Sequence, residues 1–206
     1  MTFDAVVLAG GSARRLGGAD KPMLEVDGTP MLSRVLGAVA AARLSVVVGP
    51  RRPLEPQRAG PRRALRPTVV WCQEQPPGGG PVAGLAAGLP RTAAPIVVVL
   101  AADLPWIAPA VEPLLAALNE PDPHDVALLR AGERRNYLAA AWRRPTLAGA
   151  LAAVDPRGAA MRTLVNAAQD AGARVADVPD QGWGEDCDTW ADLAAARARS
   201  IDGSRP

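Results

Sequence analysis

The residues best suited to chemistry stand close to the amino terminus, in a glycine-rich stretch that ends on a lysine. Residues 8–21 read LAGGSARRLGGADK, with four glycines within nine positions, two arginines and Lys21. Glycines let a backbone approach a ligand closely and turn its N–H groups toward an anion. The positive charges can hold a triphosphate and offset charge that develops on phosphorus during transfer. This combination predicts a site for nucleotidyl transfer.

Two familiar phosphate-binding patterns do not fit this stretch. The P-loop pattern places glycine before its lysine and a hydroxyl residue after it, but here Asp20 precedes Lys21 and Pro22 follows. The dinucleotide pattern GxGxxG needs an alternate glycine, which the run Gly10-Gly11-Ser12 does not provide. A kinase-like or dehydrogenase interpretation therefore loses its main support.

Lys21 is the only lysine of the chain, because 22 of the 23 basic residues are arginine. Most surface positions accept either cation, so a chain that has drifted to arginine keeps a lysine where the compact ammonium matters. A point charge on a flexible stem suits phosphate. We predict a functional role for Lys21 on this ground.

An aspartate at the end of an apolar run is the second chemical signal. The run over residues 96–102 is followed by Asp103. A carboxylate at the end of a buried strand is costly unless a cation meets it, and a hard divalent ion held by one carboxylate and phosphate oxygens is a natural partner. We predict that Asp103 is a metal ligand, with a helix cap before Pro105 as the alternative.

The elements that must position these residues alternate along the chain, as in βαβ units. We predict strands over residues 5–8, 45–48, 68–71, 96–100, 125–129, 138–142 and 174–178, and helices over 30–43, 82–89, 110–118, 146–154, 159–171 and 189–199. The first four strands are continuously apolar, as central parallel strands are. The strand at 138–142 follows its predecessor across a polar stretch and is expected to form a hairpin-like or edge insertion.

This pattern predicts an α/β fold of three αβα layers, Rossmann-like and doubly wound, with a mostly parallel sheet and a small antiparallel edge or hairpin. The glycine-rich stretch directly follows the first strand, so it lies at the carboxyl edge of the sheet, where such folds bind ligands. Residues 50–67 are rich in arginine and proline and are expected to form a solvated loop, or a charged lid over a ligand.

Length and composition favour one domain over residues 1–200, with an unstructured tail at 201–206. A net charge of +2 gives no large field for nucleic acid or an anionic membrane. The cysteines, Cys72 and Cys187, are too few for a disulfide scaffold. The chain begins without a basic leader and its longest apolar run is too short to span a membrane. We expect a cytoplasmic protein that binds neither nucleic acid nor membranes.

The glycine-rich stretch resembles the opening signature LAGGxSxRxGxDK of the molybdenum cofactor guanylyltransferases, within the wider nucleotidyltransferase family. The fixed positions are occupied here by Gly10, Gly11, Arg15, Gly17, Asp20 and Lys21, and Ala13 replaces the serine. The resemblance implies that Lys21 and Arg15 are catalytic. It also implies that the nucleotide is bound by Leu8, Ala9, Gly10, Gly11 and Lys21.

Two later segments extend the resemblance on the nucleotide side. Residues 80–85, GPVAGL, resemble the family's GPLAGL turn, and Glu74 stands where an acidic residue often precedes that turn. Residues 96–105 resemble the strand that ends in a DxP motif, here Asp103 to Pro105. The resemblance implies further nucleotide contacts from Glu74, Gly80, Gly84 and Asp103.

Two segments correspond to the acceptor side of the family. Residues 133–138 lie where the family carries a proline-containing segment beside the acceptor pocket, but this chain has Asn136-Tyr137 without the proline. Residues 186–193 resemble the motif [DN]xNTPEDL, with Asp188 for asparagine and Trp190 for proline. The resemblance implies acceptor contacts from Asn136 and Asp188. Asp188 is equally suited to help hold a metal or to cap the last helix.

The resemblance implies transfer of GMP from GTP to the terminal phosphate of molybdenum-bound molybdopterin, with Mg²⁺ as cofactor and release of pyrophosphate. A molybdoenzyme or its chaperone is the further partner that it implies. Three alternatives stay open: a cytidylyltransferase for the same cofactor, a guanylyltransferase for phospholactate, and a nucleotide-binding accessory protein without turnover. The opening LAGG with DK favours a guanylyl over a cytidylyl enzyme, because the latter usually opens with LAAG.

Overall fold

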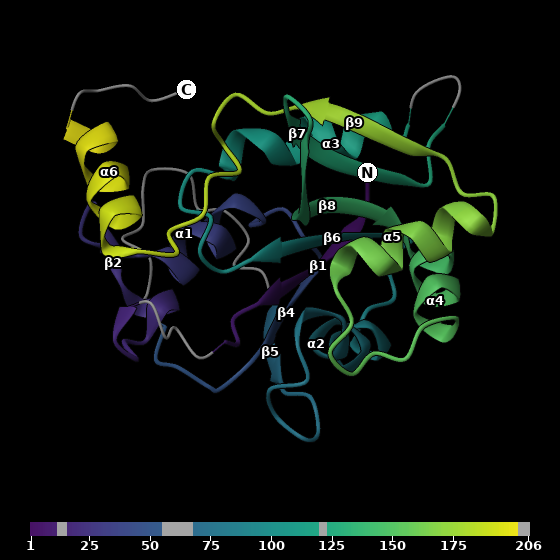
Figure 1. The fold of residues 1–206 in the computed structure, drawn as a ribbon, viewed down its shortest axis with the longest axis horizontal. Helices are drawn as coiled ribbons and strands as arrows, with labels where there is room; N and C mark the ends of the chain where they lie inside the picture. Colours follow the sequence, from purple (N-terminus) through teal and green to yellow (C-terminus); the bar gives the residue numbers. More distant parts are fainter. Residues whose placement is uncertain (12–15, 55–67, 120–122, 202–206) are drawn as a thin grey trace.

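A seven-stranded sheet crosses the part of the molecule that the computed structural model describes, residues 1–11, 16–54, 68–119 and 123–201. Its order is β5-β4-β1-β6-β8-β7-β9, which runs from the bottom to the top of Figure 1. The strands are β1 (Phe3–Leu8), β4 (Leu44–Val48), β5 (Thr68–Cys72), β6 (Ile96–Ala101), β7 (Val126–Ala131), β8 (Arg134–Arg143) and β9 (Val175–Pro179).

Within this sheet, only β8 runs antiparallel to the other strands. It pairs antiparallel with both β6 and β7, whereas β1 pairs parallel with β4 and β6, and β7 pairs parallel with β9. The predicted mostly parallel, doubly wound sheet is therefore confirmed. The expected insertion is a β7–β8 hairpin turned at Gly132, whose φ is 56°, but it lies inside the sheet and not at its edge.

Helices cover both faces of the sheet. They are α1 (Met31–Ala38), α2 (Pro81–Gly88), α3 (Val111–Ala117), α4 (Arg144–Ala152), α5 (Met161–Asp170) and α6 (Trp190–Ile201), with short 3₁₀ turns η2 (Lys21–Met23), η3 (Leu89–Arg91) and η4 (Ala108–Ala110). α1 and α3 share one hydrophobic cluster with the sheet, and α2, α4 and α5 share the other. This is the predicted three-layer arrangement.

The period of two along each strand creates the two clusters. In β6, Val98 and Leu100 face the cluster of α1 and α3, while Val97 and Val99 face the cluster of α2, α4 and α5. All four side chains are fully buried. Central strands buried on both faces read as continuous valine runs in the sequence, and for this reason their positions were predictable.

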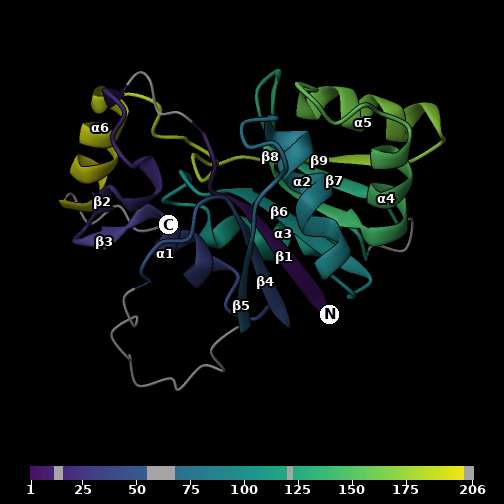
Figure 2. The ribbon, with the colours of Figure 1, turned by 90° about the horizontal axis from the view of Figure 1, so that it is seen from below.

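A small hairpin and the last helix form a third cluster beside the main sheet. β2 (Glu25–Val26) pairs antiparallel with β3 (Thr29–Pro30) across a turn in which Asp27 and Gly28 both have positive φ, 58° and 64°. This hairpin was not predicted from the sequence, although its Asp-Gly pair is a hairpin signal. Val26 packs with Trp106 and Leu193 of α6, and Figure 2 shows α6, β2 and β3 together, far from α4 and α5.

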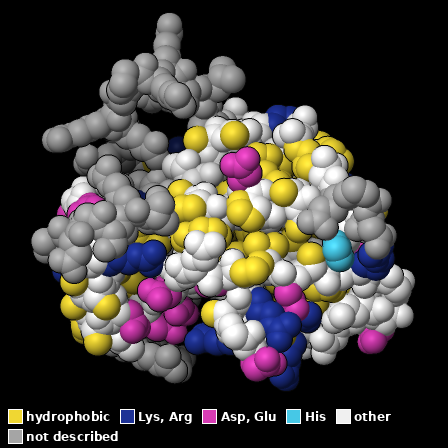
Figure 3. Space-filling view, turned by 90° about the horizontal axis from the view of Figure 1, so that it is seen from above, with side chains coloured by type: hydrophobic (Ala, Val, Ile, Leu, Met, Phe, Trp, Pro, Cys, Tyr) yellow, Lys and Arg dark blue, Asp and Glu magenta, His cyan; other side chains and the backbone are white. Residues whose placement is uncertain are grey.

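No helix within the described ranges is long and apolar enough to cross a membrane. Basic and acidic side chains adjoin each other on the face shown in Figure 3, beside a broad hydrophobic area.

α6 continues through Ile201, where the tail was predicted to begin, and residues 202–206 lie outside the described ranges.

Candidate active site

A cleft of about 940 Å³ opens at the carboxyl ends of β1, β4 and β6. These ends lie side by side because Leu8 is in register with Val48 on one side and with Ala101 on the other. The lining includes the following residues singled out by the sequence: Leu8, Gly10, Gly11, Lys21, Glu74, Gly80, Gly84, Asp103 and Asp188. The strand order thus brings segments that are far apart in the chain to one place.

Lys21 lies between two carboxylates in this cleft. Its Nζ forms an ion pair with Oδ2 of Asp103 and donates a hydrogen bond to Oδ1 of Asp188 at 2.5 Å. The side chains of Lys21 and Asp103 are 14% and 20% exposed, whereas that of Asp188 is 46% exposed. Burial alone would lower the pKa of Lys21, but the charges and hydrogen bonds of Asp103 and Asp188 outweigh it and raise the pKa above 10.5. The ammonium is therefore charged at neutral pH.

A short turn places Lys21. The carbonyl oxygen of Asp20 accepts the N–H of Met23 at 2.8 Å, and that of Lys21 accepts the N–H of Leu24 at 3.1 Å, which forms η2. Pro22 is buried within this turn. Arg15, the other residue implied as catalytic, lies outside the described residues.

Asp103 follows β6 and caps none of the described helices. Of its two carboxylate oxygens, Oδ2 faces Lys21, while Oδ1 is buried and has no hydrogen-bond partner among the described residues. An unpaired buried carboxylate oxygen is costly. Carboxylate oxygens are ligands of hard divalent cations, so the donor chemistry of Asp103 fits a cation at this position.

The last helix is capped by Thr189 and not by Asp188. The Thr189 hydroxyl accepts the N–H of Asp192 at 3.2 Å, and Oδ2 of Asp192 accepts the N–H of Thr189 at 2.7 Å. These reciprocal bonds form a capping box. The capping alternative for Asp188 is thereby wrong, and its carboxylate instead faces Lys21.

The two residues before Asp188 both have raised pKa values. Burial, together with the charges of Asp188 and Asp103, raises the pKa of Asp186 above its ordinary value. Cys187 is buried and packs in the third cluster, and burial followed by the charge of Asp103 raises its pKa to about 12. The Cys187 thiol is therefore neutral at physiological pH, which suits a side chain packed in a hydrophobic cluster.

The glycine-rich loop enters the cleft through its backbone. Gly10 and Gly11 line the cleft, and Gly11 has a φ of 123°. Ala9 does not line it, because Ala9 is buried and its N–H donates to the carbonyl oxygen of Val48 at 2.8 Å. Gly49 lies so close that a Cβ there would stand 2.8 Å from the Ala9 carbonyl oxygen. Ala9 thus anchors the loop, while the glycines after it face the ligand space.

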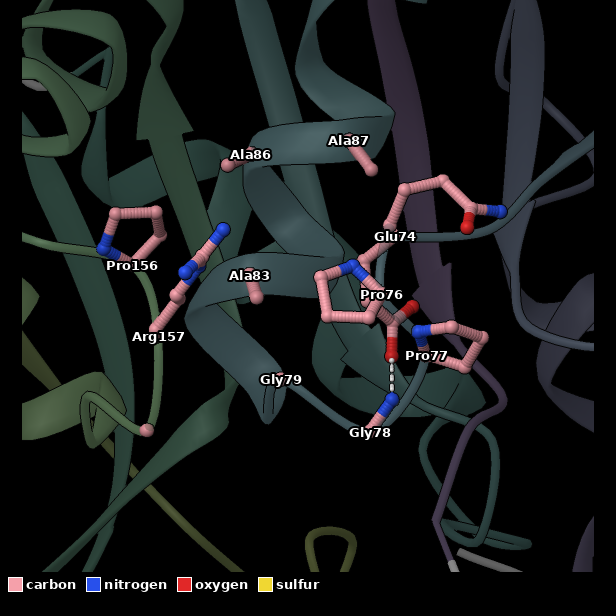
Figure 4. Close-up of a pocket in the computed structure, with 12 residues that line it drawn as sticks. Glu74, Pro76, Pro77, Gly78, Gly79, Ala83, Ala86, Ala87, Pro156 and Arg157 are labelled. Carbon is pink, nitrogen blue, oxygen red and sulfur yellow. Dashed lines mark hydrogen bonds between the residues drawn. The ribbon is translucent and has the colours of Figure 1, made fainter.

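The segment before α2 forms the opposite wall. Oε1 of Glu74 accepts the N–H of Gly78 at 2.9 Å, the dashed contact in Figure 4. A second hollow of about 510 Å³ lies on the other side of this segment, with Arg157 and Pro156 across from it and alanines of α2 between them (Figure 4). Glu74 lines both hollows.

Asn136, predicted to contact the acceptor, is not among the residues that line the cleft. Its Nδ2 donates to the carbonyl oxygen of Gly184 at 2.8 Å, and its Oδ1 accepts the N–H of Leu138 at 2.9 Å. The register of β8 against β7 shifts at this point, and Leu138 reaches the cleft. Asn136 therefore supports the bulge that carries Leu138, which sequence analysis did not single out. Such bulges commonly re-aim side chains beside active sites.

Comparison with known proteins assigns the chain to a family. Residues 5–178 match the MobA-like NTP transferase domain. The chain belongs to this family. It is accordingly a nucleotidyltransferase, as the glycine-rich stretch predicted.

Relatives of this NTP transferase include a probable molybdenum cofactor guanylyltransferase of Natronomonas pharaonis, 34% identical over 147 residues that make up 71% of each chain. Another protein of that name, from Synechococcus elongatus, is 40% identical over 119 residues. That match covers 56% of this chain and 57% of the relative, less than two thirds of the relative's length.

Solved structures show the same fold at lower identity. Molybdopterin-guanine dinucleotide biosynthesis protein A of Archaeoglobus fulgidus superimposes with a TM-score of 0.64 at 19% identity, covering 97% of this chain and 99% of that one. The 2-C-methyl-D-erythritol 4-phosphate cytidylyltransferase of Thermus thermophilus gives 0.70 at 21%, covering 98% and 100%. The NTP transferase fold is thus shared by proteins named for different nucleobases.

Proposed function

We propose that this NTP transferase is a molybdenum cofactor guanylyltransferase, which transfers GMP from GTP to the terminal phosphate of molybdenum-bound molybdopterin. The observation that carries the proposal is the meeting of Lys21, Asp103 and Asp188 in a cleft lined by the glycine-rich loop. The names of its relatives supply the acceptor and the base.

The transfer exchanges one phosphorus–oxygen bond for another. An oxygen of the acceptor phosphate bonds to the α-phosphorus of GTP, the bond from that phosphorus to the β-phosphate oxygen breaks, and pyrophosphate leaves with the electron pair. The acceptor phosphate is already anionic at neutral pH, so the step needs no general base. Its difficulty is repulsion between two anions, which positioning and fixed positive charge reduce.

Each side chain or backbone group of the site has one task in this proposal. Lys21 neutralises charge on the α-phosphate as it becomes pentacoordinate, and the N–H groups of Gly10 and Gly11 with Arg15 hold the β- and γ-phosphates. Asp103, with Asp188 beside it, would hold Mg²⁺, which would supply positive charge to offset the negative charge of the nucleotide. Nucleotide phosphate oxygens would provide the remaining ligands.

The base and the acceptor are tested together by pyrophosphate release with molybdopterin and either GTP or CTP. Pyrophosphate release is expected with GTP and molybdopterin, and not with CTP and molybdopterin. Release with CTP alone would make the protein a cytidylyltransferase, and release only with phospholactate as acceptor would move the acceptor to that compound. Binding of GTP without release under any of these conditions would support an accessory role.

The role of Lys21 is tested by Lys21→Met and Lys21→Arg. Removing the ammonium should lower the rate of pyrophosphate release about 100-fold or more, by analogy with loss of an oxyanion donor. Lys21→Arg keeps the charge but not its compact shape, so partial activity is expected. Near-normal transfer by Lys21→Met, with an unchanged circular dichroism spectrum, would contradict the mechanism.

A further inference from the structure

A guanidinium outside the predicted site joins the two ends of the glycine-rich stretch. Arg52 follows β4, and its side chain is only 9% exposed. Its Nε donates to both carboxylate oxygens of Asp20 at 2.8 and 2.9 Å, and its Nη2 pairs with Oδ1 of Asp20 at 2.7 Å. Its Nη1 donates to the carbonyl oxygens of Ala9 at 2.9 Å and Pro50 at 3.2 Å. One side chain therefore binds Ala9 and Asp20 at the same time.

Both attachment points lead directly to groups in the cleft. Asp20 precedes Lys21, and its carbonyl oxygen begins the turn η2 that carries Lys21. Ala9 precedes Gly10, whose backbone lines the cleft. Arg52 itself is not among the cleft-lining residues, so its effect on a ligand must pass through these neighbours.

We propose that Arg52 is a positioning residue of the nucleotide site. It sets the place of the Lys21 ammonium through Asp20 and the place of the Gly10 backbone through Ala9. The arrangement requires arginine, because a planar guanidinium can donate along several fixed directions, whereas an ammonium is a point charge without that fork. The turnover part of this inference rests on the proposed function, and the binding part needs only a triphosphate ligand.

The expected consequence is an effect on both binding and turnover. Without Arg52 the two ends of the loop are no longer held together, and a misplacement of about 1 Å can cost about 100-fold in rate. The Gly10 backbone and Lys21 both contact phosphate in the proposed mechanism, so affinity for GTP should fall as well. A residue that served only overall stability would lower the melting temperature and leave the KM for GTP unchanged.

The experiment compares Arg52→Gln, Arg52→Lys, Asp20→Asn and the double variant Arg52→Gln/Asp20→Asn. Arg51→Gln is the matched control, because Arg51 is adjacent and exposed and its loss removes the same charge. GTP binding is measured by calorimetry, and KM and kcat by pyrophosphate release. Arg52→Gln and Asp20→Asn should each raise the dissociation constant and the KM for GTP about tenfold and lower kcat by about 10- to 100-fold. Arg52→Lys should restore neither GTP affinity nor kcat. Arg51→Gln should stay within about twofold of the parent in both quantities. The double variant should be no worse than Arg52→Gln, because both substitutions break the same interaction.

Three results would overturn the proposal. These are equal behaviour of Arg52→Gln and Arg51→Gln, full restoration by Arg52→Lys, or losses that multiply in the double variant. If Arg52→Gln does not fold, Asp20→Asn decides alone, because the Asp20 side chain is 51% exposed and its change removes the ion pair with Arg52. A parent protein that binds GTP but does not transfer to molybdopterin would overturn the proposed function, and the binding measurements would still decide the role of Arg52.

Discussion

The Lys21 ammonium occupies the space between Asp103 and Asp188. The ammonium offsets only part of the negative charge of the two carboxylates in this partly buried cleft, and a ligand that enters must compete with an existing ion pair. A divalent ion would compete with Lys21 for Asp103, and a phosphate would compete with the carboxylates for Lys21. Metal and nucleotide are therefore expected to assist each other's binding at this site.

Substitutions of Lys21 and Asp103 should change metal affinity in opposite directions. Without nucleotide, Lys21→Met should bind Mn²⁺ roughly tenfold more tightly, because a repelling unit charge about 4 Å away is worth about 1–4 kcal/mol. Asp103→Asn should bind it more weakly by at least a similar factor. Mn²⁺ titrations monitored by electron paramagnetic resonance measure the dissociation constants of both variants.

The control for this titration is Glu133→Gln, a carboxylate whose side chain is 98% exposed and paired with Arg130 away from the cleft. It should titrate like the parent protein. An Asp103→Asn protein with an unchanged Mn²⁺ titration would remove Asp103 from the role of metal ligand.

Sequence reasoning succeeded for residues whose type alone is informative. A solitary lysine and an aspartate at a strand end both stand out, and the structure places them in contact. Arg52 could not be found in this way, because it belongs to an arginine-rich stretch in which each residue looks like its neighbours. Only the fold shows that this one arginine faces Ala9 and Asp20.

At the scale of elements, a buried carboxylate ties the start of β1 to the turn before β6. Oδ2 of Asp4 accepts hydrogen bonds from Nη2 of Arg43 at 2.8 Å and from the N–H groups of Ala93 and Ala94 at 2.7 and 2.9 Å. Asp4 is completely buried. Burial would raise the pKa of Asp4, but Arg43 and the two N–H groups outweigh it and hold the pKa below 3.8.

Asp4→Asn should therefore destabilise the protein and alter its response to acid. Because the folded state holds this proton less tightly than the unfolded state, the contribution of Asp4 is complete above about pH 4 and is lost as pH falls through the lowered pKa. Loss of the charge from a buried, hydrogen-bonded site should cost about 2–4 kcal/mol at pH 7. Urea unfolding at pH 7 and pH 3 measures this, and the difference between parent and variant should shrink at pH 3. A constant difference would contradict the assignment.

Position 49 requires glycine because the chain after β4 passes close to the chain after β1. Its φ is 143°, and a Cβ there would stand 2.8 Å from the Ala9 carbonyl oxygen. Gly49→Ala should cost about 2–3 kcal/mol in stability through backbone strain and should weaken GTP binding by displacing the glycine-rich loop. Gly132→Ala is the control, because Gly132 also has positive φ but has nothing within 4 Å of its Cβ position. Calorimetric GTP binding that is equal in the two variants would contradict this reason for the glycine.

The predicted elements were most accurate where hydrophobicity was continuous and least accurate where charged residues form strands. β8 begins at Arg134, within the stretch that was expected to be a polar connection. Its charged part is accommodated because Arg135 pairs with Asp177 of β9 at 2.6 Å, as does Arg130 of β7 at 2.8 Å. Such cross-strand pairing depends on strands that are distant in sequence, so local patterns do not reveal it.

At the scale of the whole molecule, the site depends on a cluster beside the main sheet. Trp106 packs with Val26, Leu193 and Cys187, and the guanidinium carbons of Arg34 and Arg199 lie 4.5 and 5.3 Å from its ring centre. This cluster joins α6 to the β2–β3 hairpin, which follows Lys21 closely in the chain. Docking of α6 thereby helps to hold Asp188 against Lys21.

Leu193→Ala should loosen α6 without unfolding the main sheet. Leu193 is 1% exposed, and removing a buried leucine side chain costs about 2–5 kcal/mol. Hydrogen exchange should accelerate in α6 and the β2–β3 hairpin while β1 and β6 stay protected, and transfer activity should fall. Leu164→Ala, in the cluster of α5, is the comparison, since it should not accelerate hydrogen exchange in α6. Equal acceleration throughout the molecule would contradict separate docking.

The enclosure of Lys21 also makes it a chemical reporter. The chain has one lysine, so an acylating reagent such as an N-hydroxysuccinimide ester finds a single side-chain amine in the entire molecule. Acylation requires the neutral amine, which the two flanking carboxylates disfavour. The mass gained at Lys21 over time therefore measures how often that amine loses its proton and meets solvent, with no engineered label.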